Sequence, residues 1–143
     1  MEIGKTIEEI AVGDVASVAR TVSDADVSLF AGVTGDINPV HLDEEYAKGT
    51  FFKGRICHGM LSAGLISAAL ANKLPGIGTI YLGQNLKFMA PVRIGDTVRA
   101  EVEVTDLNVE KNIAKLRTTC TTQDGTVVIQ GEATVMPPKK PKD

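Results

Sequence analysis

The sequence predicts a single α+β domain in which an antiparallel sheet curls around one buried helix. Two observations lead to this fold class. Residues 58–72 are apolar or small on nearly every side, which is typical of a helix buried in a core. Residues 97–109 alternate almost strictly between apolar and polar side chains, which indicates a strand with one solvated face. The chain of 143 residues has the length of one domain, which we expect over residues 1–136.

The first third of the chain predicts one strand and two short helices. Residues 15–22 are rich in β-branched side chains and predict the strand. Ser23 is a suitable N-cap for an amphipathic helix over residues 24–33, whose first turn carries acidic side chains that complement the helix dipole. Asp43 can cap a second short helix over residues 44–48.

The rest of the chain predicts one long helix followed by strands. Residues 51–57 carry no clear period and are expected to be irregular, and a proline-glycine pair at 75–76 ends the helix that follows them. Asp124 and Gly125 form a hairpin signal between the last two strands. The lysine- and proline-rich tail, residues 137–143, has nothing to pack against and is expected to be disordered. The predicted strands cover residues 79–88, 97–109, 113–122 and 126–135.

Composition excludes several classes of protein. The net charge of −3 gives no reason to expect nucleic acid or an anionic membrane as a partner. No apolar run reaches the ~18–20 residues of a membrane span, and the first residues lack the pattern of a secretory signal, so we expect a cytoplasmic protein. Cys57 and Cys120 have no metal-ligand spacing and are expected to be free thiols. Cys57 and His58 are adjacent, and neighbours in sequence rarely point at each other as a nucleophilic pair does.

The residues best suited to chemistry lie in the stretch 34–43, where Asp36 and His41 are five positions apart. Asn38 and Pro39 between them are turn formers, so the stretch is expected to be a stiff loop rather than helix or strand. A carboxylate and an imidazole at a fixed separation can hold one water molecule between them, as acid–base chemistry on water requires. The other interpretation, an Asx-turn at Asp36 and a surface histidine at His41, remains open on spacing alone.

A second candidate site is the start of the long helix. Its first turn, at Gly59 and Met60, presents unpaired backbone N–H groups at the positive end of the helix dipole, which suits an oxyanion or a polarised carbonyl. His58 is either a second acid or base, or a structural residue that starts the helix and orients the turn. Asp36, His41 and His58 do not form a typical metal-ligand set, so we expect no metal.

These motifs resemble those of the (R)-specific enoyl-CoA hydratases in the MaoC-like hot-dog group. The resemblance rests on Asp-x-Asn-Pro-x-His at 36–41 followed by His-Gly-Met at 58–60, with further similarity at 81–84 and 91–96. It covers roughly residues 12–135 and leaves only the lysine-rich tail unmatched. The resemblance implies the hot-dog fold, in which the sheet wraps the long helix and two subunits pair into a continuous sheet. We therefore expect a homodimer at the least, which also covers the hydrogen-bonding edge that long strands leave open.

The resemblance also implies an activity, the reversible hydration of a trans-2-enoyl-CoA to an (R)-3-hydroxyacyl-CoA, with no bound cofactor. In this mechanism Asp36 and His41 hold the water and act as the acid–base pair. The backbone N–H of Gly59 polarises the thioester oxygen, where enolate charge develops. The acyl-CoA thioester is the expected partner of the site.

Three further positions are candidates for substrate binding by this resemblance. Asn38 is expected to brace the loop rather than to touch substrate. Ser67 falls where the family places a polar residue near the acyl pocket, and its alternative is a hydroxyl bonded back to its own helix. Tyr81 either lines the acyl tunnel or is a tyrosine of the sheet core.

Two other functions are considered beside the hydratase. A hot-dog acyl-CoA thioesterase is a different enzyme class, and the acyl-carrier-protein dehydratases of the same broad fold use a different mechanism. Those dehydratases place an acidic residue on the long helix, and so do the thioesterases that need a helix carboxylate. Residues 60–71 here contain no Asp or Glu, which argues against both mechanisms. A non-catalytic acyl-binding subunit is disfavoured because both Asp36 and His41 are present.

Overall fold

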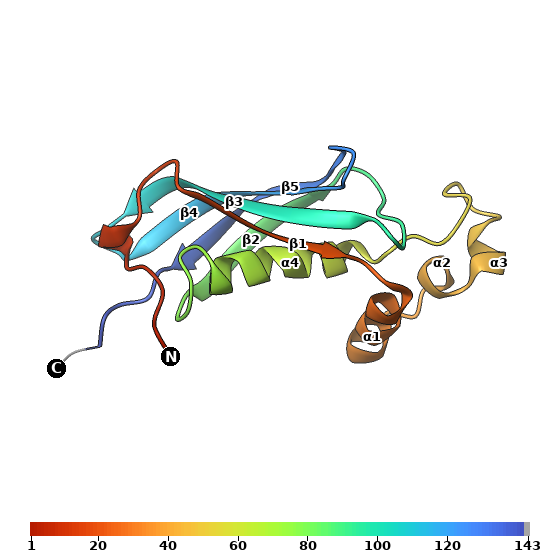
Figure 1. The fold of residues 1–143 in the computed structure, drawn as a ribbon, viewed down its shortest axis with the longest axis horizontal. Coiled ribbons are helices and arrows are strands. Elements are labelled where there is room, and N and C mark those ends of the chain that lie inside the picture. Colours follow the sequence, from red (N-terminus) through yellow and green to blue (C-terminus); the bar gives the residue numbers. More distant parts are fainter. Residues whose placement is uncertain (142–143) are drawn as a thin grey trace.

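The structure, a computed structural model, describes residues 1–141 and contains one five-stranded sheet with four helices. The strand order is β1-β3-β4-β5-β2, and every neighbouring pair is antiparallel. The long helix α4 runs along one face of the sheet, and α1–α3 lie beyond one end of it (Figure 1). The predicted α+β class is therefore confirmed. After a 3₁₀ turn at Ile7–Glu9 the elements are β1 (Val15–Thr21), α1 (Asp24–Thr34), α2 (Pro39–Leu42), α3 (Glu44–Ala47), α4 (Gly59–Asn72), β2 (Ile80–Phe88), β3 (Thr97–Asn108), β4 (Ile113–Thr121) and β5 (Val127–Met136).

The core lies between α4 and the concave face of the sheet. The alternation predicted over β3 is confirmed, because its apolar side chains are fully buried while Arg99 and Glu101 between them are exposed. Ile66 and Leu70 of α4 belong to the same buried cluster. Burial of this apolar surface is the main force that holds the helix to the sheet. The β3 side chains of the core are Val98, Ala100, Val102 and Val104.

The helix α4 is not buried on every side, in contrast to the prediction. One stripe along it is exposed, and we call this the open stripe. Its members recur at the spacing of one helix face, so they lie in a row along the helix. The sequence did not distinguish this exposed row from the buried face of the helix, because small residues occur on exposed and buried faces alike. The open stripe consists of Met60, Gly64, Ser67 and Ala71.

The stretch 34–43 contains a turn of helix that the sequence did not predict. Residues 39–42 form α2, with Pro39 at its first position. The Asn38 side chain accepts a hydrogen bond from the Val40 amide at 3.2 Å, which satisfies one of the unpaired N–H groups at the helix start. His41 therefore lies on a short helix rather than on an open loop, and Asn38 braces this stretch as expected.

The expectation that nothing packs from residue 137 onward is wrong at the start of the tail. Pro137 and Pro138 are buried, and the Pro137 carbonyl accepts a hydrogen bond from the Asn112 side-chain amide at 2.9 Å. Residues 139–141 form no regular secondary structure, and residues 142–143 lie outside the described part of the chain.

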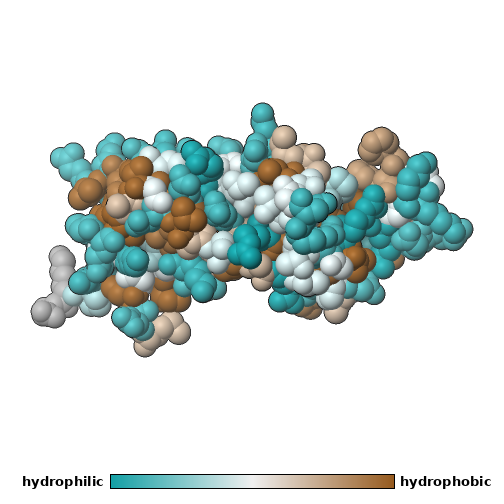
Figure 2. Space-filling view, turned by 45° about the horizontal axis from the view of Figure 1, so that its top comes forward, coloured by the Kyte–Doolittle hydropathy of each residue, from teal (hydrophilic) through white to brown (hydrophobic). Residues whose placement is uncertain are grey.

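The strand β2 forms one edge of the sheet, and its apolar side chains are largely exposed. Ile80, Tyr81 and Leu82 each expose about half of their surface, at 56%, 41% and 49%. Figure 2 shows hydrophilic residues over much of one face of the molecule, with hydrophobic patches between them. In the described range 1–141, no helix has the length and apolar character needed to cross a membrane.

Candidate active site

Asp36, His41 and His58 come together in one cluster, although 22 positions separate the first from the last. One nitrogen or carboxylate oxygen from each lies within 4.8 Å of the others. His41 is only 9% exposed, so the interpretation as a surface histidine is wrong. Asp36 is exposed, and its Oδ1 accepts from the Asn38 amide at 3.3 Å, so the Asx-turn is also present. The turn fixes the carboxylate without using its second oxygen.

Hydrogen bonds to carbonyl oxygens determine which nitrogen of each histidine carries a proton. His41 Nδ1 lies 2.8 Å from the Ile56 carbonyl oxygen, and His58 Nε2 lies 2.9 Å from the Asp36 carbonyl oxygen. A carbonyl can only accept, so both of these nitrogens must donate. The remaining nitrogen of His41, Nε2, therefore carries a lone pair when the ring is neutral, which is what a general base requires.

His58 connects the parts of the cluster. Its ring lies 3.9 Å from the His41 ring and 4.6 Å from the Phe30 ring, measured between centroids. The side chain is 2% exposed, and its Nδ1 is buried with no hydrogen-bond partner among the described residues. His58 does not line the cavity that contains His41 and Gly59, and its Nε2 is already bonded to a carbonyl, so the geometry favours a positioning role over a second acid or base. His58 holds the backbone of Asp36 and one face of the His41 ring, directly before the start of α4.

The cluster has the residue types of a metal site without its geometry. The His41 and His58 rings are tilted by only 31° and face each other, so their in-plane lone pairs do not converge on one point. His41 Nδ1 and His58 Nε2 already donate to carbonyls, and His58 Nδ1 is buried. A tetrahedral or octahedral cation needs converging, accessible donors, and this donor set does not provide them.

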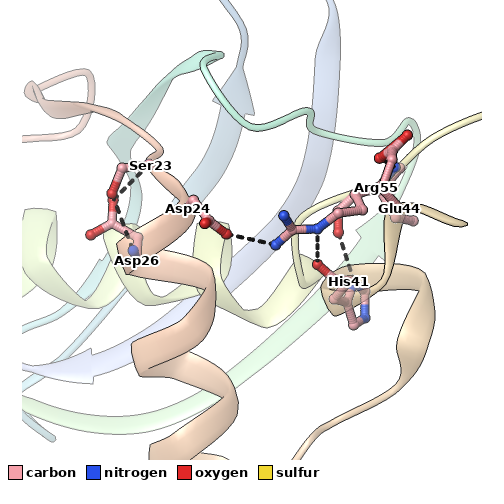
Figure 3. Close-up of polar contacts among 7 residues, drawn as sticks. Ser23, Asp24, Asp26, His41, Glu44 and Arg55 are labelled. Carbon is pink, nitrogen blue, oxygen red and sulfur yellow. Dashed lines mark hydrogen bonds and ion pairs between the residues drawn. The ribbon is translucent and has the colours of Figure 1, made fainter.

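The irregular segment 54–58 holds His41 in place. Arg55 donates from Nε to the His41 carbonyl at 2.7 Å and from Nη2 to Asp24 Oδ1 at 2.7 Å, so it bridges α1 and α2 (Figure 3). The neighbouring Ile56 donates its amide to the Val40 carbonyl at 3.2 Å and accepts from the His41 ring. His41 is thus fixed through its ring, its own carbonyl and the residue before it.

Two charged side chains stabilise this segment in turn. A Glu44 carboxylate oxygen accepts from the Arg55 amide at 3.1 Å, and Arg93 donates to the carbonyls of Phe52 and Gly54. Gly54 is buried between the Glu44 and Arg93 side chains, where a Cβ would meet a Glu44 oxygen at 3.1 Å. Sequence reasoning missed the role of this segment because its hydrogen bonds join distant residues and produce no periodicity. Gly54 and Arg55 were its only local signals.

A largely apolar cavity of about 390 Å³ adjoins the cluster. His41 and Gly59 both line it, so the structure brings the predicted base and the predicted start of α4 to one cavity. Phe88 packs against Gly59 so closely that a Cβ at Gly59 would lie 2.6 Å from the Phe88 ring. Ser62, one turn further along α4, also lines the cavity and was not identified from the sequence.

Ser67 and Tyr81 lie together in a second cavity, of about 450 Å³, between the open stripe of α4 and β2. Neither lines the cavity that contains His41 and Gly59. Tyr81 is 41% exposed and is therefore not a core residue of the single chain, and its hydroxyl donates to Gln84 Oε1. The resemblance placed both residues near the acyl chain and apart from the catalytic residues, and their contact with substrate stays a prediction.

The two cysteines are free, as predicted, and both are buried. Burial raises the pKa of the Cys57 thiol to about 11 and that of the Cys120 thiol to about 12. Both thiols are therefore protonated near neutral pH, and a thiolate is the nucleophilic form. This agrees with the view that Cys57 and His58 do not form a nucleophilic pair.

Comparison with known proteins gives one consistent result. The family described as MaoC like domain matches residues 9–126. An (R)-specific enoyl-CoA hydratase from Rhodospirillum rubrum is 59% identical over 133 residues, which cover 93% of this chain and 92% of that protein. A 3-hydroxybutyryl-CoA dehydratase from Methylorubrum extorquens is 49% identical over 133 residues, covering 93% and 84%.

Solved structures agree with the sequence comparisons. An R-hydratase from Pseudomonas aeruginosa in its unliganded form superposes with a TM-score of 0.91 and is 47% identical, covering 96% of this chain and 88% of that one. An (R)-hydratase from Aeromonas caviae gives a TM-score of 0.89 at 46% identity, covering 92% and 99%. The sheet wrapped around α4 is therefore the hot-dog fold that the resemblance implied, and this chain belongs to the MaoC-like domain family.

Proposed function

We propose that this protein catalyses the reversible hydration of a trans-2-enoyl-CoA to an (R)-3-hydroxyacyl-CoA in the cytoplasm. One observation carries the proposal: the Asp36–His41–His58 cluster adjoins an apolar cavity that also contains the start of α4. Relatives at 59% and 49% identity are named as an (R)-specific enoyl-CoA hydratase and a 3-hydroxybutyryl-CoA dehydratase, which supports the same chemistry here.

In the proposed mechanism, Asp36 and His41 hold one water molecule at the cluster. The pair takes one proton from the water as its oxygen bonds to C3 of the enoyl group and then gives that proton to C2, so the pair ends in the protonation state in which it began. The product gains one hydroxyl and one hydrogen, so the reaction needs no redox partner and no bound cofactor. Because His41 Nδ1 is occupied by the Ile56 carbonyl, the proton on the His41 side moves through Nε2.

Negative charge develops on the thioester oxygen while the new bond to C3 forms. The first amides of α4 have no partner within the helix, and His58 at the N-cap provides no side-chain hydrogen bond to them. We propose that the Gly59 amide binds this oxygen, with the helix dipole adding a favourable field. The acyl chain is proposed to occupy the apolar walls of the cavity, and Ser67 and Tyr81 to contact its distal part from the second cavity.

A homodimer is the predicted assembly, joined through β2. Three features support it: within residues 1–141 β2 pairs with β5 alone and leaves one edge open, its apolar side chains are exposed, and the open stripe of α4 lies next to it. Sedimentation at micromolar concentration is expected to give the mass of two chains. Leu82→Glu should shift the protein toward monomer, whereas Val109→Glu, at a similarly exposed residue that follows β3, should leave the mass unchanged. A monomeric wild-type protein would contradict the prediction.

An assay with crotonyl-CoA separates hydration from thioester hydrolysis. Addition of the protein is expected to lower the absorbance of the conjugated thioester, because water adds across its double bond, without release of free thiol. Equal absorbance loss and thiol release would instead identify a thioesterase. No change in either signal would exclude both activities for this substrate.

A further inference from the structure

Ser62 has the properties of a residue reserved for a ligand. It is 1% exposed, lines the cavity of His41 and Gly59, and its Oγ has no hydrogen-bond partner within residues 1–141. A buried helical serine ordinarily donates its hydroxyl to a carbonyl of the preceding turn. Ser62 does not, and a buried polar group without a partner destabilises the fold. A buried hydroxyl without a hydrogen-bond partner, in a cavity that is otherwise largely apolar, calls for a functional explanation.

The position of Ser62 on α4 places its hydroxyl near the start of the helix. Residues three apart share one helix face, so Ser62 and Gly59 present to the same side, and both line the same cavity. Helical side chains tilt toward the N-terminus, which directs the Ser62 hydroxyl over the first turn. Gly59 and Ser62 therefore border the same part of the cavity, with the Ser62 hydroxyl buried in its wall, one χ1 rotation away from a bound ligand.

We propose that the Ser62 hydroxyl is the second hydrogen-bond donor to the thioester oxygen, beside the Gly59 amide. This inference rests on the proposed hydratase function and extends its binding site. The hydroxyl keeps its proton throughout, and its hydrogen bond strengthens as charge develops on the oxygen. The orphaned hydroxyl of the free protein is thus satisfied when the thioester binds.

This role predicts opposite effects on stability and on activity. Ser62→Ala removes a group that has no partner in the free protein, so the melting temperature should stay the same or rise. The same change removes one oxyanion donor, so kcat should fall by about 10²-fold. A serine that only packs in the core would show no loss of activity, so the fall in kcat at unchanged or higher stability is the result specific to this role.

The test measures melting temperature and crotonyl-CoA hydration for Ser62→Ala beside Ser28→Ala, an exposed helical serine of α1. Both changes alter helix propensity equally, and Ser28→Ala is expected to retain the wild-type rate. A Ser62→Ala protein with wild-type kcat, or with a melting temperature clearly below that of Ser28→Ala, would overturn the proposal.

A second pair of variants separates the hydroxyl from its volume. Ser62→Thr and Ser62→Val have nearly the same size, and only Thr keeps the hydroxyl, so Thr should be at least ten times faster than Val. Equal rates for the two would reject the hydroxyl as a donor. An inactive wild-type protein would reject the hydratase function itself, whereas an active wild type with an equally active Ser62→Ala rejects only the role of Ser62.

Discussion

Asp36→Asn and His41→Ala are each expected to lower the rate of hydration by at least ~100-fold, the usual contribution of general acid–base catalysis. Asn at position 36 keeps an oxygen for the Asx-turn with the Asn38 amide, so the backbone should persist while the charge is lost. His41→Ala removes the ring that lines the cavity and donates to the Ile56 carbonyl. The measurement is steady-state hydration of crotonyl-CoA, with circular dichroism to confirm the fold.

Asp43→Asn provides the matched control for loss of a negative charge in the same stretch. The Asp43 side chain caps α3 by accepting from the Tyr46 amide at 3.2 Å, and Asn caps a helix equally well. This variant should therefore keep both its fold and its rate. A folded Asp36→Asn protein with near-normal hydration would remove Asp36 from the mechanism, and the same result for His41→Ala would remove His41.

Gly59→Val is expected to abolish most of the activity while Asp36 and His41 remain in place. A Cβ at Gly59 would lie 2.6 Å from the Phe88 ring, so the ring must move and the new side chain occupies the approach to the helix start. The loss of one oxyanion donor corresponds to ~10²–10³-fold in kcat. Shorter enoyl-CoA substrates should not restore the rate, because the obstruction is at the thioester and not along the acyl chain.

Gly32→Ala in α1 serves as the control for this substitution. Gly32 is also a helical glycine, and a Cβ there would meet nothing within 4 Å. Because Ala is the better helix former by ~1 kcal/mol, this variant should be at least as stable as the wild type and fully active. Rates for Gly59→Val that recover with a shorter acyl chain would place the obstruction in the acyl pocket and contradict the assignment of Gly59.

Features with a local physical cause could be predicted from the sequence. The strict alternation of β3 identified its buried face, and Ser23 with Asp26 formed the predicted start of α1 through reciprocal hydrogen bonds. Asp36 and His41 were identified because the turn formers between them limit their separation. The helical turn at Pro39 was missed because a single turn has too few residues to show a period.

Features that depend on packing could not be predicted in the same way. The hydrogen bonds of Arg55 and Ile56 to His41 join residues about 15 positions apart, and no pattern in either segment indicates the other. Ser62 and Ser67 are both serines on one helix, and only the packed structure shows that they line different cavities. The open stripe of α4 was likewise hidden, because its small residues would also suit a buried face.

The configuration of the product tests the central claim most directly. Wild-type protein is incubated with crotonyl-CoA, and the 3-hydroxybutyryl group is analysed by chiral chromatography after hydrolysis. Because Asp36 and His41 lie in one cluster and therefore deliver water to one face of the bound enoyl group, a single enantiomer is expected, and the proposed function requires it to be (R). Formation of the (S) product, or of a racemic mixture, would contradict it.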